Sequence, residues 1–224
     1  MSADARHLHP HAPPSHQPRR GFLMMVVAPS GVGKTSLTRR LVADHQDLQL
    51  SISYTTRDKR PGEQDERDYF FTDRPSFDAM VADNAFLEWA EVYGQRYGSP
   101  RAPIMGLLEQ GESVLFDIDL QGAASIRAQA PEDSVCVYLL PPSLAEMRRR
   151  LHARSQDTEE TIHKRLERAK HEIVEWESFD YVLVNENFDA AYAELAHIYH
   201  AERSRRARNP WISTFVADLL DEGI

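Results

Sequence analysis

The sequence has only one cysteine among its 224 residues, Cys136, which excludes an intramolecular disulfide and a zinc site built from cysteines. Its longest apolar stretch, 22–29, is far shorter than the ~20 residues of a membrane-spanning helix. There is no excess of positive charge: the formal net charge of −9 argues against a general nucleic-acid-binding protein. Hydrophobic residues still make up 42% of the chain, enough to form a core. We therefore expect a folded cytoplasmic protein with one domain, or one core domain with insertions.

Residues 1–20 differ from the rest of the chain. They hold four of the ten histidines and four of the thirteen prolines, with almost no large apolar side chain. A histidine-rich tract can bind metal, but without a fixed backbone it is a weak site, so we interpret the segment as a disordered tail. Arg19-Arg20 before an apolar stretch resembles a twin-arginine export signal. That stretch is short and leads into a glycine-rich motif rather than a cleavage site, so we exclude the signal.

After residue 20, short apolar stretches alternate with stretches of helical pattern. The apolar stretches are 22–27, 113–116, 135–140 and 181–184, and the helical stretches that follow them are 34–43, 121–129, 143–153 and 189–202. Continuous apolar strands separated by helices are typical of a buried parallel sheet, which belongs to the α/β class. Such a sheet binds its ligands at the carboxyl ends of its strands.

Three segments depart from this alternation. Residues 51–100 are rich in polar and aromatic side chains and predict a small inserted subdomain. Residues 154–176 carry charges of both signs at helical spacing, which is typical of a solvated helix. Residues 208–224 contain spaced apolar side chains and suggest an amphipathic helix, docked on the core or on a neighbouring subunit.

The most specific motif follows the first apolar stretch and opens the first helix. It is Ala28-Pro29-Ser30-Gly31-Val32-Gly33-Lys34-Thr35. Backbone N–H groups of such a loop line a nest for a polyphosphate, Lys34 supplies charge to the β and γ phosphates, and Thr35 can bind Mg²⁺. Ala28 stands where the motif normally begins with glycine. We expect an ordinary backbone there, with Gly31 and Gly33 in the unusual conformations.

A phosphate loop predicts a bound nucleotide but does not settle the reaction. Asp119-Leu120-Gln121-Gly122 matches the D-x-x-G element of GTP-hydrolysing switches, but the sequence has no N-K-x-D motif to read guanine as they do. A kinase instead needs a second anion site and arginines placed over a polyphosphate.

The remaining motifs resemble those of the guanylate kinases, from Phe22 to about Tyr199. They are Ser51-Ile52-Ser53-Tyr54-Thr55-Thr56-Arg57, Arg60-Pro61-Gly62-Glu63, Asp68-Tyr69-Phe70-Phe71, Phe86-Leu87-Glu88-Trp89-Ala90, Tyr97-Gly98-Ser99, Asp117-Ile118-Asp119-Leu120-Gln121-Gly122 and Asp157-Thr158-Glu159-Glu160 with Lys164-Arg165-Leu166. The resemblance implies a phosphate-loop NTPase-type core, an inserted monophosphate-binding subdomain and a mobile helical lid. It also implies transfer of the γ-phosphoryl group of ATP to GMP, and to dGMP, with Mg²⁺.

The resemblance also implies boundaries. The kinase-like domain is expected over 21–207, with a GMP-binding insert at 51–100 and a lid at 154–176. The core then consists of 21–50, 101–153 and 177–207, and 208–224 is a C-terminal extension.

The phosphate of GMP is expected to meet two arginines and two tyrosines of the insert. Arg57 and Arg60 flank a turn, and a guanidinium group matches phosphate oxygens with two parallel hydrogen bonds. Tyr69 and Tyr97 add hydroxyl groups. Either arginine alone fits a solvated surface charge, but the four residues together favour a phosphate site.

Guanine presents two adjacent donors, which suit a carboxylate, and an acceptor at O6, which suits a hydroxyl. The resemblance assigns these roles to Glu88 and Ser53, with Ser99 also lining the base site. Glu88 read by itself fits a solvent-facing strand residue equally well.

Two aspartates lie at and beyond the end of the second predicted core strand. An acidic residue at that position usually serves Mg²⁺, so Asp117 is expected to assist Thr35 at the metal, possibly through water. The resemblance also places Asp117 and Asp119 near GMP. Asp119 fits a helix N-cap as well as it fits a binding residue.

The lid arginines complete the predicted site. Arg150 and Arg154 are four residues apart and so share one helix face. With Arg165, Lys34 and Arg57 they resemble the groups that act in phosphoryl transfer. Ser155 stands where the family usually has glycine, which affects the hinge more than the chemistry. Another residue, Asn185, resembles the adenine contact of the family.

Two alternatives remain: a non-catalytic guanylate-kinase-like binding module, or a kinase for a different monophosphate. Binding modules of that kind typically lose the loop lysine and some lid arginines, whereas Lys34, Arg150, Arg154 and Arg165 are all present. Glu88 argues for guanine over other bases. We expect nucleotides as partners, with no nucleic acid and no membrane, and the sequence leaves a homo-oligomer open.

Overall fold

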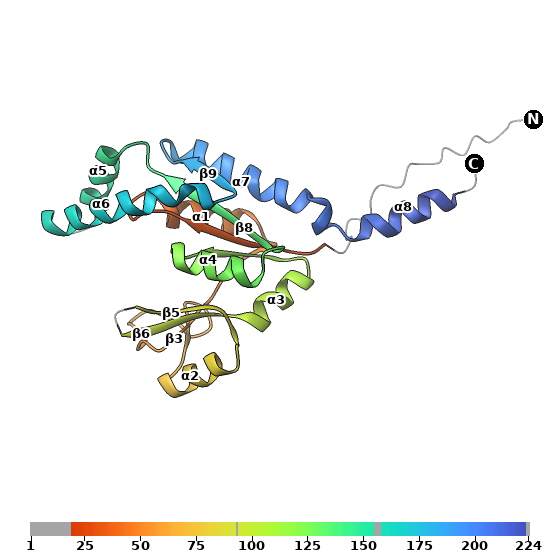
Figure 1. Ribbon diagram of the computed structural model, residues 1–224, viewed down its shortest axis with the longest axis horizontal. Coiled ribbons are helices and arrows are strands. Elements are labelled where there is room, and N and C mark those ends of the chain that lie inside the picture. The colour runs from red at the N-terminus through yellow and green to blue at the C-terminus, as the bar shows by residue number, and fades with distance from the viewer. Residues whose placement is uncertain (1–18, 93, 155–157, 223–224) are drawn as a thin grey trace, which may run out of the picture.

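The computed structural model describes residues 19–92, 94–154 and 158–222 and is built around a five-stranded parallel sheet (Figure 1). The strand order is β2-β7-β1-β8-β9. The strands are β1 (Leu23–Val27), β2 (Leu48–Leu50), β7 (Ser113–Asp117), β8 (Ser134–Leu140) and β9 (Tyr181–Val184). The four predicted core strands are confirmed. The edge strand β2 was not predicted, because it has three residues and only Leu48 is buried.

Helices cover both faces of this sheet (Figure 1). They are α1 (Lys34–Asp44), α3 (Arg101–Glu109), α4 (Leu120–Gln129) and α7 (Phe188–Ser204). Alternate residues of β1 point to opposite faces, as the period of a strand requires. Met24 and Val26 pack in one cluster with side chains of α1 and α7. Met25 and Val27 pack in a second cluster with side chains of α3 and α4. Each of these two strand–helix layers therefore has its own apolar core.

The segment 54–100 forms a separate small sheet that lies beside α4 and α3 (Figure 1). Its order is β4-β3-β6-β5. The elements are β3 (Tyr54–Thr55), β4 (Phe70–Phe71), α2 (Arg74–Ala82), β5 (Phe86–Val92) and β6 (Gln95–Pro100). Buried aromatic side chains hold α2 on the sheet: Phe77 stacks on Phe86 with ring centroids 4.6 Å apart.

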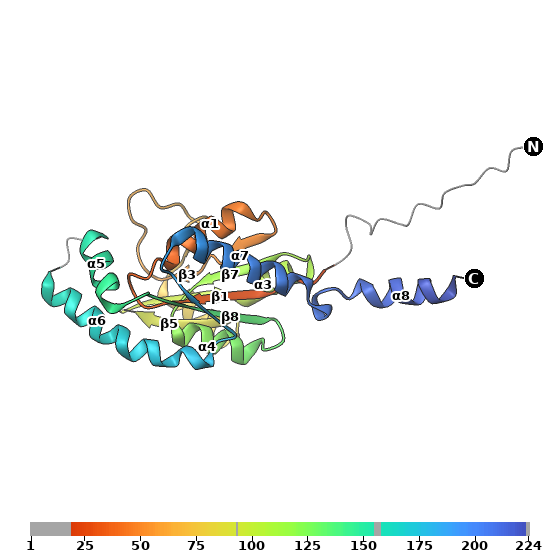
Figure 2. The ribbon, with the colours of Figure 1, turned by 90° about the horizontal axis from the view of Figure 1, so that it is seen from above.

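A helical arm lies at one end of the core sheet (Figure 2). It consists of α5 (Leu144–Arg154), α6 (Glu159–Ile173) and the 3-10 helix η1 (Val174–Ser178). Met147 and Leu151 of α5 pack with Ile162 and Ala169 of α6 in a small apolar cluster. The Tyr138 hydroxyl of β8 donates to a backbone carbonyl of α6 at 2.8 Å, which ties the base of the arm to the core.

The C-terminal part contains η2 (Arg206–Arg208) and α8 (Trp211–Asp221). The expected helix is present, but it projects away from the core in both views (Figures 1 and 2). Its apolar side chains Phe215, Val216, Leu219 and Leu220 are exposed, with Leu220 at 80%. Among the described residues, no helix is both long and apolar enough to span a bilayer.

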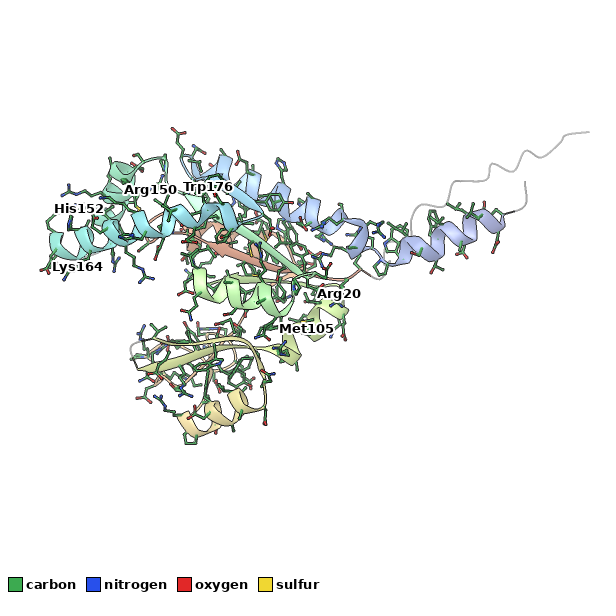
Figure 3. All side chains as sticks on the ribbon, viewed as in Figure 1. Arg20, Met105, Arg150, His152, Lys164 and Trp176 are labelled. Atoms are coloured by element: carbon green, nitrogen blue, oxygen red, sulfur yellow. The ribbon has the colours of Figure 1, made fainter. Side chains whose placement is uncertain are left out.

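The predicted tail lies outside the described residues except for its last two. Of these, Arg20 already belongs to the folded body (Figure 3): its Nε donates to Asp133 Oδ1 at 2.8 Å, and Arg208 Nη1 donates to the same oxygen at 2.9 Å. Asp133 thus connects the start of the core with the start of the C-terminal part.

Candidate active site

The candidate site lies at the carboxyl edge of the parallel sheet. β1 runs into the glycine-rich loop, β7 ends at Asp117 and β9 ends one residue before Asn185. The register places Val26 of β1 beside Asp117 of β7. Because all five strands are parallel, these loops meet at one edge, which is where open α/β sheets bind ligands.

The glycine-rich loop has the backbone expected from its sequence. Gly31 and Gly33 have φ of +90° and +104°, in the region that favours glycine, and Ala28 is not among the residues with positive φ. Val32 between the glycines is fully buried in the core. The loop therefore turns around an apolar anchor and begins α1 at Lys34.

Lys34, Thr35 and Asp117 form one polar group beneath the loop. Lys34 Nζ contacts Asp117 Oδ1 at 2.7 Å and donates to the Ile118 carbonyl at 2.7 Å. Thr35 Oγ1 donates to Asp117 Oδ2 at 3.2 Å. An ammonium group has three donors, so Lys34 keeps one for a ligand. The Thr35 and Asp117 oxygens are hard ligands, which fit a magnesium ion that keeps water and phosphate in its other positions.

A hollow of about 450 Å³ opens in front of this group. Its lining residues come from the loop, α4 and α6: Ala28, Pro29, Ser30, Gly31, Gly33, Lys34, Thr35, Asp119, Arg165, Arg168 and Glu172. We call it the phosphate hollow. The structure thus brings Arg165 of the predicted lid to the phosphate loop, across more than 100 residues of sequence.

A second hollow of about 300 Å³ adjoins the loop and shares Gly31, Gly33 and Thr35 with the first; we call it the outer hollow. It is lined by Gly31, Gly33, Thr35, Ser36, Arg39 and Arg150. Arg39 was not singled out from the sequence, although it lies one helical turn after Ser36. In the described part of the chain its side chain has no ion-pair partner, whereas that of its neighbour Arg40 contacts Asp189 at 2.6 Å.

The arm places its arginines differently. Arg150 Nη1 donates to the Val32 carbonyl at 3.2 Å, and Arg150 Nε donates to Glu146 Oε1 at 2.8 Å. In Figure 3, Arg150 lies nearer the central sheet than His152, which lies toward the outer end of the arm. Arg154 ends α5, but its side chain, like Ser155, lies outside the described residues.

In the small sheet, Arg57 is gathered with the two predicted tyrosines. Its guanidinium carbon lies 5.3 Å from the ring centre of Tyr69, whose ring centre is 6.0 Å from that of Tyr97. Glu63 holds the guanidinium in a fork: Nη2 to Oε1 is 2.7 Å and Nη1 to Oε2 is 3.0 Å. Two hydrogen bonds, from Arg57 and from the Arg60 backbone N–H, lower the pKa of the Glu63 carboxyl.

Glu63 was part of a quoted motif but had no predicted role. It also accepts a hydrogen bond from the Arg60 backbone N–H at 2.8 Å, so one carboxylate orients Arg57 and fixes the turn. The Arg60 side chain has no hydrogen bond within the described residues. Glu63 therefore contacts the side chain of Arg57 and the backbone of Arg60, and holds the two residues in one turn.

The predicted base-binding residues Glu88 and Ser99 face each other on β5 and β6. The Ser99 hydroxyl donates to Glu88 Oε1 at 2.7 Å, and Ser99 is fully buried. Burial raises the pKa of Glu88, and the nearby charge of Asp119 raises it further. Glu88 is therefore not a solvent-facing strand residue. The third residue, Ser53, is half-buried, and its carbonyl accepts from the Phe70 N–H at 3.0 Å.

Asp119 connects the two halves of the site. Its side chain caps α4 by accepting from the Gly122 N–H at 3.0 Å, as one of its two sequence readings predicts. It also lines the phosphate hollow and lies close enough to Glu88 to raise the pKa of that carboxyl. The phosphate loop and the small sheet therefore meet at Asp119.

A larger hollow of about 750 Å³ lies away from this chemistry, between α4 and the α6–η1 segment. It shares Arg168 and Glu172 with the phosphate hollow, but it contains no residue of the glycine-rich loop. Across the described residues, no group of three or more His, Cys, Asp or Glu side chains is placed to hold a metal ion. The phosphate hollow, in contrast, is lined by the predicted loop residues together with Asp119 and Arg165.

Comparisons with known proteins identify the family and agree with the fold. Residues 20–202 match the family model described as guanylate kinase. A guanylate kinase of Caulobacter vibrioides is 70% identical over 210 residues, covering 94% of this chain and 99% of the relative. A guanylate kinase of Maricaulis maris is 48% identical, covering 91% and 94%. The crystal structure of guanylate kinase from Anaplasma phagocytophilum superposes with a TM-score of 0.70 at 30% identity, covering 90% of this chain and 96% of that one.

Proposed function

The chain belongs to the guanylate kinase family, and from this premise we propose how its residues bind and align ATP and GMP. The protein transfers the γ-phosphoryl group of ATP to GMP, forming ADP and GDP. The observation that carries our assignment is the position of Asp119, which lines the phosphate hollow and influences Glu88. We therefore place the two nucleotides on either side of Asp119.

We assign the donor to the phosphate hollow. Ser30, Gly31, Val32 and Gly33 supply the loop whose N–H groups cradle the phosphates of ATP. Lys34 uses its third N–H on the β and γ phosphates, while Asp117 and the Ile118 carbonyl hold the ammonium group in place. Asn185 belongs to the donor site through its contact with this loop.

We assign the acceptor to the small sheet. The Arg57 fork, oriented by Glu63, binds the GMP phosphate together with Arg60, Tyr69 and Tyr97. Glu88 accepts from guanine N1–H and the 2-amino group. The hydroxyls of Ser53 and Ser99 complete the base site, in which Ser99 also holds Glu88. Asp117 and Asp119 lie at the boundary with the donor. The same contacts accept dGMP, because none of these side chains is assigned to the 2′-hydroxyl.

A divalent cation accompanies ATP in kinases, and we propose Mg²⁺. Thr35 Oγ1 would hold it, with Asp117 nearby, directly or through water; the two oxygens that fit it lie 3.2 Å apart. When bound, the cation neutralises charge on the β and γ phosphates. The protein side chains do the positioning.

Transfer needs alignment and charge neutralisation rather than a general base, because the attacking phosphate oxygen carries no proton to remove. Arg150, Arg154 and Arg165 approach the phosphates when the arm of α5 and α6 closes. Closure also excludes water, which otherwise competes with GMP as acceptor. We therefore propose that 154–176 is the lid and 51–100 the acceptor insert, with a core of 21–50, 101–153 and 177–207. We also propose a cytoplasmic location.

An isotope experiment tests this assignment. With ATP labelled at the γ position and GMP present, the label should appear in GDP, and ADP should be unlabelled. With GMP omitted, release of labelled inorganic phosphate should be slower by at least tenfold, because the open site lacks the aligned acceptor. Rapid phosphate release without GMP would instead indicate an ATP-hydrolysing protein.

A further inference from the structure

Asn185 lies behind the glycine-rich loop, directly after β9. Its side chain is buried, with 4% of the residue exposed. Its backbone N–H continues the sheet by donating to the Leu140 carbonyl at 2.9 Å. Its Nδ2 donates to the Val32 carbonyl at 2.7 Å, which joins two segments 153 residues apart. Asn185 is therefore fixed by the sheet and in contact with the loop.

The shape of the loop shows how close this contact is. A Cβ atom at Gly33 would lie 2.6 Å from Asn185 Nδ2, closer than two such atoms approach in proteins. Any side chain at Gly33 would displace the carboxamide, in addition to the strain of its φ of +104°. The Asn185 carboxamide thus occupies the space where a side chain of residue 33 would otherwise lie.

The Val32 carbonyl and the Gly33 N–H belong to one peptide group. A trans peptide is planar and points its C=O and N–H in opposite directions. Holding the Val32 carbonyl toward Asn185 therefore turns the Gly33 N–H to the opposite side of the loop. Among the described residues, no protein group accepts a hydrogen bond from this N–H. Gly33 itself lines both the phosphate hollow and the outer hollow.

We propose that Asn185 is a positioning residue for the donor: it holds the Val32–Gly33 peptide so that the Gly33 N–H faces the phosphates of ATP. The inference rests on the donor site proposed above. It differs from a direct contact with adenine, because Asn185 is buried and lines neither the phosphate hollow nor the outer hollow.

Arg150 also donates to the Val32 carbonyl, but unlike Asn185 it belongs to the arm and is partly exposed. Its side chain is about one-quarter exposed and lies on the arm, where Glu146 holds it. If the arm closes and Arg150 turns to the phosphates, its bond to Val32 at 3.2 Å is lost. Asn185 belongs to the end of the sheet rather than to the arm, so its hydrogen bond to the Val32 carbonyl is kept. The peptide therefore keeps its orientation during closure through Asn185 alone.

The test replaces Asn185 with leucine, which has a similar volume but no N–H donor, and with serine, which is smaller and neutral. The matched control is Asn187→Ser, because Asn187 lies in the same turn but only caps α7, by accepting from the Ala190 N–H. KM is measured for ATP, for ITP, whose base lacks the 6-amino group, and for GMP. The inhibition constant of inorganic tripolyphosphate, which has no base, is measured against ATP.

Both Asn185 variants should raise KM for ATP and for ITP by the same factor, about tenfold, the effect of losing one well-placed hydrogen bond to a charged group. Tripolyphosphate inhibition should weaken by that factor, while KM for GMP and all constants of Asn187→Ser stay close to wild type. A higher KM for ATP, with the KM for ITP and the inhibition constant of tripolyphosphate unchanged, would show an adenine contact and overturn the proposal. Unchanged donor constants with a lower melting temperature would show a purely structural role and overturn it too.

A failure of the proposed function can be distinguished from a failure of the Asn185 proposal. If the wild-type protein makes no GDP from GMP, binding of ATP and tripolyphosphate measured by calorimetry still compares the Asn185 variants with Asn187→Ser. If leucine at 185 prevents folding, the serine variant decides by the same criteria.

Discussion

Replacing Glu88 with glutamine tests the base-binding half of the site. In the proposed site the two carboxylate oxygens of Glu88 accept from guanine N1–H and the 2-amino group. The Ser99 hydroxyl donates to one of these oxygens at 2.7 Å. Glutamine keeps the shape and one acceptor oxygen, but it turns an NH₂ group toward one of the two guanine donors. Glu88 is half-buried beside the fully buried Ser99, so the carboxylate is partly shielded from water.

The magnitude follows from the cost of an unpaired buried donor. That cost is ~1–3 kcal/mol, and more when the lost partner was charged. At about 1.4 kcal/mol per factor of ten, this cost corresponds to a fall of about 5- to 150-fold in kcat/KM for GMP. We expect the upper part of this range in Glu88→Gln, because the lost partner is charged. AMP presents a lone pair at N1 rather than a donor, so its kcat/KM should change much less. IMP keeps N1–H but lacks the 2-amino group, and it should be poorer than GMP in the wild-type protein.

The assay measures kcat/KM for GMP, IMP and AMP in both proteins with ATP in excess. The selectivity for GMP over AMP should narrow by at least about tenfold. Equal losses for the three substrates would show that Glu88 supports the sheet rather than reads the base. The melting temperature of Glu88→Gln, compared with the wild-type value, reports any loss of folding separately.

Further predictions concern the donor site, pH and the N-terminal segment. Lys34→Met should lower kcat by about 100-fold or more, the scale of losing one main electrostatic donor, with the melting temperature nearly unchanged; a near-normal kcat would refute the role of the loop. Arg39→Gln should raise KM for ATP several-fold without changing KM for GMP, whereas Arg40→Gln should leave both KM values unchanged; equal effects of the two variants would make Arg39 a solvated charge. The KM for GMP should rise as the pH falls, beginning at a higher pH than for an ordinary glutamate, because the raised pKa of Glu88 protonates its carboxylate earlier; this dependence should disappear in Glu88→Gln. Removal of residues 1–18, which hold almost no large apolar side chain to bury, should leave the melting temperature within about 2 °C of wild type in a thermal scan. A larger fall would refute our interpretation of this segment.

Much of the core could be predicted from the sequence, because short continuous apolar runs that alternate with helical stretches are typical of buried parallel strands. The run 113–116 became a buried strand with Asp117 at its carboxyl end, and the glycine-rich loop took positive φ at the two predicted glycines. These features depend on local sequence. The strand β2 escaped prediction because three residues with one buried side chain give no periodic signal.

The contacts that organise the site were not readable, because they join distant segments. No spacing indicates that Asn185 reaches the Val32 carbonyl, and only the family resemblance led us to expect Arg165 near the phosphates. Glu63 had a local signal, an acidic residue three positions after Arg60, but a charge in a polar turn usually faces solvent. Asp119 is the N-cap of α4, as one of its two readings predicts, and its role at GMP stays a prediction.

One measurement tests the central claim most directly: the kcat/KM of the wild-type protein with ATP and each of GMP, AMP, UMP and dTMP, followed by coupled formation of ADP. The arrangement of Glu88 and Ser99 beside the phosphate hollow predicts that GMP is used at least 100-fold better than the other three, because only guanine pairs both carboxylate oxygens with donors. Comparable values for AMP or UMP, or no ADP formation with GMP, would contradict the assignment of the small sheet as a guanine site.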